Sequence, residues 1–426
     1  MGESRIVPQA PYRRRLELHI LSEIPTALGL VLWQDLRHLR DWADAASGTE
    51  REALFPRQRP GWVAAKRAEA RAFAPELSDA LDAFDELLAE RSAADARRLA
   101  RACVAVAEWA EELRHVETAI QFADAAACVA PDDPRLANLA GRIARNAADF
   151  ARAEAWFERA IMLAREQKNG VELTRAHLGC GILCKELRRV RSARRHFERA
   201  ANLARRAGFE WLAAEAQHDL FAYLLVRGHY HRAAEHARKA FALYPKHNRR
   251  LPGFAVDLAL LLVCTGRYTE AVRLLRLALR MLTDDGVRSL GTALLLRARA
   301  AQGRSAEVEA LFRRVEKALG RHPKWEAAMH WHLAAAEHAL GRTPAARSHA
   351  RTAIRLATTR HDRETVRLVR KLLQEFDVGH PAAMPLPMSD PDLAAFTETV
   401  VRRLAEWSPT RLAREPKTLA RREWAA

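Results

Sequence analysis

The stretch "FARAEAWFERAIMLAR" (residues 150–165) is the clearest sign of the fold, because the chain repeats it forty residues further on. The second copy, "VRSARRHFERAANLAR" (190–205), is identical at eight of the sixteen aligned positions. Around the first copy a Gly, an Ala, a large aromatic residue and a second Ala follow at set spacings, as Gly141, Ala153, Phe157 and Ala160. Small residues allow two helices to approach closely. One such hairpin cannot bury both of its faces, so it must stack on a copy of itself.

The same pattern returns with variations, at spacings of 34 to 40 residues, and makes about seven units between residues 96 and 360. The composition agrees with helix throughout, since Ala, Leu and Arg dominate and all three are strong helix formers. No run of useful length alternates apolar and polar residues as a half-buried strand would. The sequence therefore predicts an all-α fold built from stacked hairpins.

Two further units show the turn between the helices. "RGHYHRAAEHARKAFALYP" (227–245) and "TGRYTEAVRLLRLAL" (265–279) each have a Gly followed two residues later by an aromatic residue and then by spaced Ala residues. This pattern resembles the tetratricopeptide repeat (TPR) family. Most units here are longer than the 34-residue period of that family and resemble the extended repeats of bacterial peptide-sensing regulators. The resemblance implies a right-handed α-solenoid (superhelix) of about seven TPR-like helix hairpins.

The remainder of the chain divides around this array. Residues 12–46 place Leu30, Trp33, Leu36 and Leu39 at helical spacing, and further helices are predicted over 62–91 and 94–112. Residues 377–391 hold four prolines, and Leu393, Phe396, Val400, Leu404 and Trp407 share one face of a helix after them. We expect an N-terminal helical cap (1–95), the array (96–360), a capping helix (361–377), a Pro-rich linker (378–391) and an amphipathic helix with a basic tail (392–426).

The chain is strongly basic, with a formal net charge of +17. One interpretation is the coding bias of a GC-rich bacterial genome combined with solvated helix faces, because 53 acidic residues are interleaved with the 70 basic ones. The other is a real anionic partner such as nucleic acid. The five cysteines are few and odd in number, which indicates reduced thiols. The N-terminus has no signal-peptide pattern and no apolar run is long enough to span a bilayer, so we expect a soluble cytoplasmic protein with no membrane partner.

Side chains that could carry chemistry are few. His177, Cys180 and Cys184 lie at i, i+3 and i+7 of a helix and could hold zinc, but the register of the resembled family puts them at packing positions. The His groups 229–236 and 330–338 are assigned to a hairpin corner and to different sides of one helix. No Gly-rich phosphate loop, nucleophile elbow or His-Glu-x-x-His motif is found. We therefore predict no catalytic residue, no metal, no cofactor and no enzymatic activity.

The resemblance also implies which side chains line the concave groove of the solenoid, since these come from set positions of each first helix. The first part of the groove is basic and amide-rich, and the later part is apolar. The candidate ligand-binding residues are Arg135, Asn138, Arg142, Arg145, Asn146, Arg175, Lys185, His218, Leu225, Val256, Leu260 and Val263.

The apolar part of such a groove needs an occupant. The two candidates are an external peptide or helix and the chain's own 392–407 helix, returned by the Pro-rich linker as an autoinhibitory plug. We expect a non-enzymatic TPR scaffold or regulatory protein that binds a peptide or protein segment in the groove. The alternatives are nucleic-acid (RNA) binding through the basic surface, or a structural subunit of a larger complex that docks through Trp33 and Trp42. A homodimer stays open.

Overall fold

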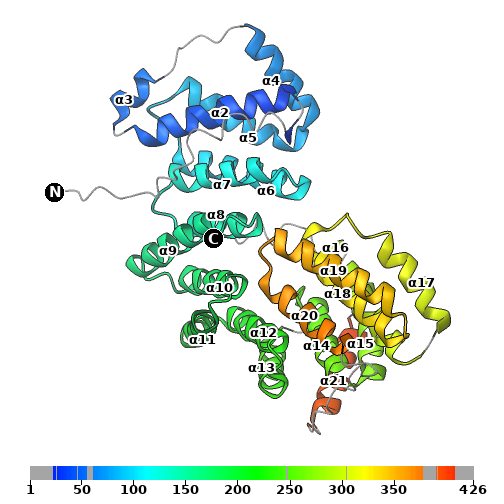
Figure 1. Cartoon of the computed structure of the whole chain (residues 1–426). Coiled ribbons are helices and arrows are strands. Elements are labelled where there is room, and N and C mark those ends of the chain that lie inside the picture. The colour runs from blue at the N-terminus through cyan, green and yellow to red at the C-terminus, as the bar shows by residue number, and fades with distance from the viewer. Residues whose placement is uncertain are drawn as a thin grey trace. The chain divides into compact units, whose positions relative to one another are not determined.

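The computed structural model describes residues 23–407, apart from positions 25, 46, 55–60, 246–247, 304, 378–389 and 391. Every secondary-structure element in these ranges is helical, and they contain no strand (Figure 1). The all-α prediction is confirmed. The predicted linker, apart from Asp390, and the basic tail after Trp407 lie outside the described residues.

The chain divides into two compact units, Met1–Leu183 and Cys184–Ala426. In unit 1 the elements are α2 (Thr26–Asp44), α3 (Gly48–Ala53), α4 (Gly61–Phe73), η1 (Pro75–Leu77), α5 (Ser78–Ala89), α6 (Ala96–Leu113), α7 (Val116–Val129), α8 (Pro134–Asn146), α9 (Phe150–Glu166) and most of α10 (Gly170–Glu186).

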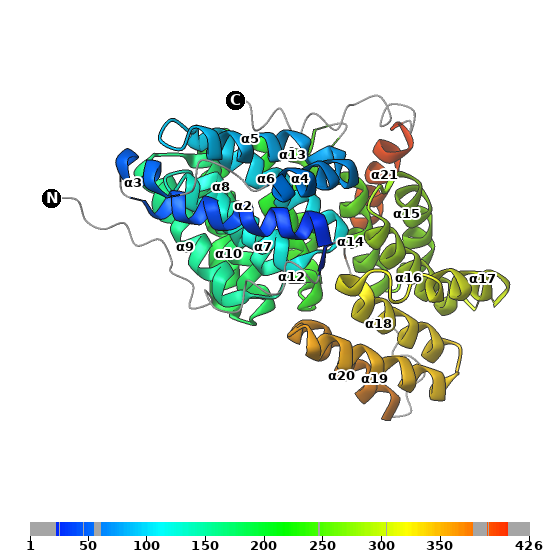
Figure 2. The same ribbon diagram turned by 90° about the horizontal axis from the view of Figure 1, so that it is seen from above.

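Unit 2 continues the series of hairpins. Its elements are α11 (Val190–Arg206), α12 (Glu210–Val226), α13 (Tyr230–Leu243), α14 (Leu251–Cys264), α15 (Tyr268–Met281), α16 (Asp285–Ala301), α17 (Ser305–Glu316), α18 (Pro323–Ala339), α19 (Thr343–Thr359), α20 (Arg363–Asp377) and α21 (Asp392–Ala405). Helices adjacent in sequence pack together: α12 with α13, α14 with α15, and α18 with α19. Figure 2 shows α16, α18 and α19 following one another in this unit, as their mutual contacts require.

The close approach of helices predicted from the small residues around the repeated stretch is present in unit 1. Phe157 on α9 is 2% exposed. A Cβ atom added to Gly141 on α8 would lie 2.8 Å from the Phe157 ring, and one added to Gly179 on α10 would also overlap that ring. The ring therefore fills the space between two first helices that only glycine leaves open. Gly141 of this contact belongs to the predicted pattern, whereas Gly179 does not.

The turns inside the hairpins explain the recurring glycine. Gly228, Gly266 and Gly341 have φ of 80°, 79° and 76°, in the left-handed region that glycine adopts without strain. Ala148 and Arg188 occupy the same turn position of the two hairpins before Gly228, with φ of 64° and 58°. A side chain at such a position strains the backbone, so these two residues carry a cost that glycine would avoid.

The N-terminal part of unit 1 differs from the prediction in two ways. The buried stripe of α2 contains Leu28, Val31, Leu32, Leu36 and Leu39, whereas the expected Leu30 and Trp33 are only half-buried. The buried side of α2 depends on its neighbours α4 and α7, which the apolar period alone does not locate. The helix expected over 62–91 is broken into α4, η1 and α5. Pro75 at the start of η1 has no backbone N–H and ends α4.

A buried ion pair joins three helices of this region. Arg67 on α4 donates to Asp35 on α2 at 2.8 Å and forms an ion pair with Asp85 on α5 at 2.8 Å, and the Arg67 side chain is 4% exposed. It also donates to the carbonyl oxygen of Leu81 at 3.0 Å. The pair fixes how α2, α4 and α5 meet, because either charge alone in this site would be strongly unfavourable.

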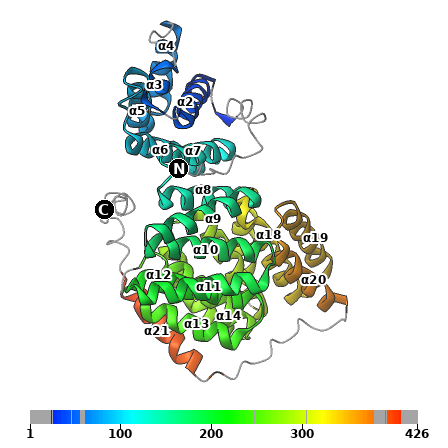
Figure 3. The ribbon, with the colours of Figure 1, turned by 90° about the vertical axis from the view of Figure 1, so that its left-hand side faces the viewer.

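The last two helices of unit 2 close different faces. On α20, Val369, Leu372 and Phe376 pack into a cluster with Trp331 and the alanines of α19. On α21 the predicted apolar face is confirmed, since Leu393, Val400, Leu404 and Trp407 are buried. Figure 3 shows α21 beside α13 and α14, and it contacts α15 as well.

Specific contacts hold α21 to the second helix of a hairpin. The Phe396 ring meets the Phe241 ring edge-on at a centroid distance of 5.5 Å. The Arg403 guanidinium lies over the Phe241 ring and donates to the Phe241 carbonyl oxygen at 3.0 Å. This helix therefore forms part of the core of unit 2 on the side of α13 and α15.

Candidate functional site

The predicted polar residues of unit 1 form a ladder that crosses α6, α8 and α10. Glu111 on α6 accepts from Arg142 at 2.9 Å and from Asn146 at 2.9 Å, both on α8. Arg145 donates to the amide oxygen of Asn146 at 3.0 Å. One carboxylate thus orients two of the candidate side chains. We use the name polar ladder for this set together with its continuation along α8 and α10. Its members are Glu111, Asp133, Arg135, Asn138, Arg142, Arg145, Asn146, Glu172 and Arg175.

The second half of the polar ladder joins α8 to α10. Asn138 donates to the carboxylate of Glu172 at 2.7 Å and to its backbone carbonyl oxygen at 3.0 Å. Glu172 in turn accepts from Arg175 at 2.6 Å. Glu172 is 2% exposed, so this buried carboxylate is kept in place by an amide and a guanidinium.

Three arginines of the polar ladder, Arg135, Arg142 and Arg175, each have an acidic partner and remain partly accessible. Arg135 pairs with Asp133, the N-cap residue of α8, at 2.9 Å. The exposed side-chain fractions of Arg135, Arg142 and Arg175 are 41%, 40% and 34%. The guanidinium groups are therefore held in position as donors, while their charges are balanced by neighbouring carboxylates. Such an arrangement suits polar groups of a peptide better than it suits a polyanion.

The remaining candidate ligand-binding residues belong to unit 2. Lys185, at the end of α10, is half-buried. His218 on α12 is 9% exposed, with Nε2 3.0 Å from Asp257 and Nδ1 2.8 Å from the Tyr244 hydroxyl. Burial raises the pKa of Tyr244, so its hydroxyl keeps its proton and can donate to Nδ1. With Phe254 packed against its ring at 5.2 Å, His218 is part of an internal network.

The apolar half of the predicted groove is covered by the chain's own helices. Leu225, Val256 and Val263 are 3%, 5% and 2% exposed. Val256 lies against Gly291 of α16, and Leu260 packs against the cluster of α18, α19 and α20. The residues proposed as a surface for an external segment, or for residues 392–407, are thus part of the core of unit 2.

Two of the three groups considered for metal binding are largely buried, whereas His229 and His231 of the third are exposed. His177, Cys180 and Cys184 are buried, in agreement with their assignment to packing positions. His330 meets His349 with their Nδ1 atoms 3.0 Å apart, and burial lowers the pKa of His330 to about 4. Within the described ranges, no three His, Cys, Asp or Glu side chains form a group that could hold a metal ion. Trp42, offered above as a docking residue, is 2% exposed and donates to the Arg91 carbonyl oxygen at 2.7 Å.

The structure contains a second candidate site, which was not predicted from the sequence. A cavity of about 680 Å³ in unit 2 is lined by one face of α20 and by Arg188 from the turn before α11. The basic residues of α20 stand at positions 363, 367, 370 and 371, which share one helix face, so this spacing was available as a signal. The approach of Arg188 was not, because it lies 175 residues earlier in the chain.

Comparison with known proteins adds no assignment: no protein-family model matches the chain, and no curated protein matches it significantly. Among the described helices, none combines the length and apolar character needed to cross a bilayer.

Proposed function

We propose that this protein is a non-enzymatic TPR-like scaffold that binds a peptide or protein segment through the polar ladder of unit 1. The observation that carries the proposal is the set of three partly exposed arginines, two on α8 and one on the next first helix α10, each held by its own carboxylate. Consecutive helices of a repeat array present such groups at regular intervals, which suits an extended chain with regularly spaced backbone carbonyl groups.

The charge balance of the polar ladder supports a peptide over a nucleic acid as the ligand of unit 1. Nucleic-acid affinity derives largely from cations that neutralise phosphates. Here Glu111, Asp133 and Glu172 already pair with the arginines. A phosphate backbone would therefore compete with three carboxylates, whereas a peptide carbonyl can accept from the N–H groups that the carboxylates leave unused.

The experiment is affinity capture from native lysate with nuclease treatment, using the wild-type chain, Arg142→Ala and Arg175→Ala. Arg98→Ala is the matched control, because Arg98 is an exposed arginine of the same unit that pairs with Glu86 outside the polar ladder. We expect a discrete polypeptide that survives nuclease and is depleted by both ladder variants only. Capture that is equal for all four proteins, or that is lost on nuclease treatment, contradicts the proposal.

A further inference from the structure

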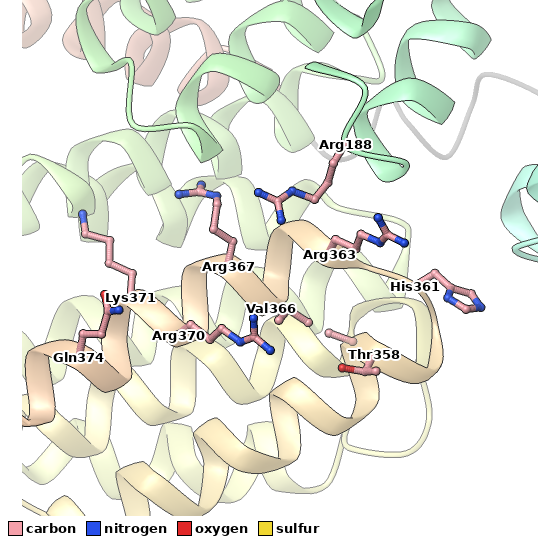
Figure 4. Close-up of a pocket in the computed structure, with 10 residues that line it drawn as sticks. Arg188, Thr358, His361, Arg363, Val366, Arg367, Arg370, Lys371 and Gln374 are labelled. Carbon is pink, nitrogen blue, oxygen red and sulfur yellow. The ribbon is translucent and has the colours of Figure 1, made fainter. Parts of the chain in front are cut away.

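The cavity on α20 differs from the polar ladder in its charge. Five cationic side chains surround it: Arg188, Arg363, Arg367, Arg370 and Lys371. Figure 4 shows Arg188 reaching from its turn toward the same opening that Arg363 and Arg367 reach from α20. The described lining contains no acidic residue. We call it the cationic cleft.

The charges of the cationic cleft are largely unbalanced. Arg367 pairs with Glu364 and donates to the Val226 carbonyl oxygen, and Glu364 also lies 3.6 Å from Arg227. These contacts attach α20 to the end of α12. Within the described residues, the side chains of the other four cations make no hydrogen bond or ion pair. Like charges on one helix face repel each other, and Arg188 adds a further positive charge from a distant segment.

The backbone of Arg188 gives a second, independent observation. Its φ of 58° is the conformation that the later hairpins give to glycines such as Gly228 and Gly266. An arginine here keeps a strained backbone and also brings its guanidinium into a cluster of like charges. Ala148 shares this backbone conformation, so what distinguishes Arg188 is that its guanidinium joins the cations of α20.

We propose that the cationic cleft binds a small anion that carries two or more phosphoryl groups. The volume is that of a small-molecule site. Guanidinium groups bind phosphoryl oxygens through paired N–H donors, and a chain of two or three phosphoryl groups carries about three to five negative charges, which is comparable to the positive charge of the cationic cleft. The proposal uses residues that the function proposed for unit 1 does not involve.

The lining favours this ligand over the larger polyanions. Apart from the imidazole of His361 it offers no aromatic ring on which bases could stack, as single-stranded nucleic acid requires. Its apolar surface is limited to Ala357 and Val366, which leaves little to anchor the side chains of an acidic peptide. Charge is the main property that the cationic cleft presents.

The test is calorimetric titration of the full chain with inorganic tripolyphosphate at about 0.15 M salt. We expect saturable binding that weakens about tenfold in Arg188→Gly and about tenfold in Arg370→Gln, since each change removes one charge-assisted contact. Glycine relaxes the backbone at position 188, so this variant should melt at the same or a higher temperature than wild type. Ala148→Gly, the same turn position in the preceding hairpin, should leave the affinity unchanged.

Three results overturn the proposal. Tripolyphosphate binding that is absent, or that is equal in wild type, Arg188→Gly and the non-glycine variant Arg188→Gln, removes the cationic cleft as the site. Equal affinity for citrate shows a site for anions in general without phosphoryl preference. An RNA oligonucleotide that binds more tightly than tripolyphosphate with the same variant sensitivity assigns the site to nucleic acid. None of these results bears on polypeptide capture by the polar ladder.

Discussion

Adding one methyl group at Gly179 tests the packing of Phe157 between consecutive hairpins. A Cβ at this position would overlap the Phe157 ring, and the ring has little room to move because it also packs closely on Gly141, where an added Cβ would lie 2.8 Å from it. Alanine gains about 1 kcal/mol over glycine from helix propensity. Overpacking in a closed core costs about 1–3 kcal/mol, so after the gain in helix propensity we expect Gly179→Ala to lower the free energy of unfolding by up to about 2 kcal/mol.

A double-mutant cycle makes this reasoning quantitative. Phe157→Ala alone should cost about 3–5 kcal/mol, as truncation of a buried phenylalanine does. Once the ring is removed, the added methyl group has room, so Gly179→Ala in that background should be neutral or stabilising, with a coupling energy of about 2 kcal/mol. Gly253→Ala is the matched control: this glycine is also helical, but a Cβ there meets no atom within 4 Å. It should be neutral or stabilising.

The assay combines urea denaturation followed by circular dichroism with hydrogen exchange of peptides from α9 and α10. Hydrogen exchange localises the effect, because repeat arrays can open one region at a time. The close approach of α8, α9 and α10 is refuted if Gly179→Ala stabilises the wild-type background by about 1 kcal/mol, as Gly253→Ala can. It is also refuted if the two changes at 157 and 179 simply add.

Three further predictions concern buried charges. Arg67→Met leaves Asp35 buried without its partner and should cost about 3–5 kcal/mol in urea denaturation, while Asp35→Asn with Arg67→Met should recover much of it; a single change without effect contradicts the buried pair. Burial lowers the pKa of His330 to about 4, so its contribution to stability is present above the unfolded-state value near 6.5 and is lost as pH falls toward 4; the melting temperature of His330→Leu should depend less on pH in that window than that of wild type. Burial raises the pKa of Asp124 to about 6 although Arg152 and Trp156 oppose the shift, so stability from this group is lost as pH rises from about 3.8 through 6. Asp124→Asn should remove that loss. If the pH profile of the melting temperature is the same in Asp124→Asn and wild type, the raised pKa of Asp124 is contradicted.

The residues taken in chain order were sufficient to establish a series of helical hairpins. Helix propensity is set by the residue types within a segment, and the small and large residues around Phe157 repeat at one spacing. Both the helices and their repetition can therefore be read along the chain. For the same reason the left-handed turns at Gly228 and Gly266 and the apolar face of α21 were predictable. In the site, the residue types of the polar ladder were identified, but the pairing of Arg142 with Glu111 was not.

Everything that depends on which distant segments meet was settled by tertiary packing. A helical period shows that α2 has an apolar stripe, but the contacts with α4 and α7 select which side of it is buried. Leu260 reads as a groove residue, but it packs against the cluster of α18, α19 and α20. Residues 392–407 read as a plug, but Phe396 packs on Phe241 of α13. Arg188 reads as an ordinary solvated arginine. Only the tertiary structure places it beside the cations of α20, because these residues are distant in sequence and are brought together by packing.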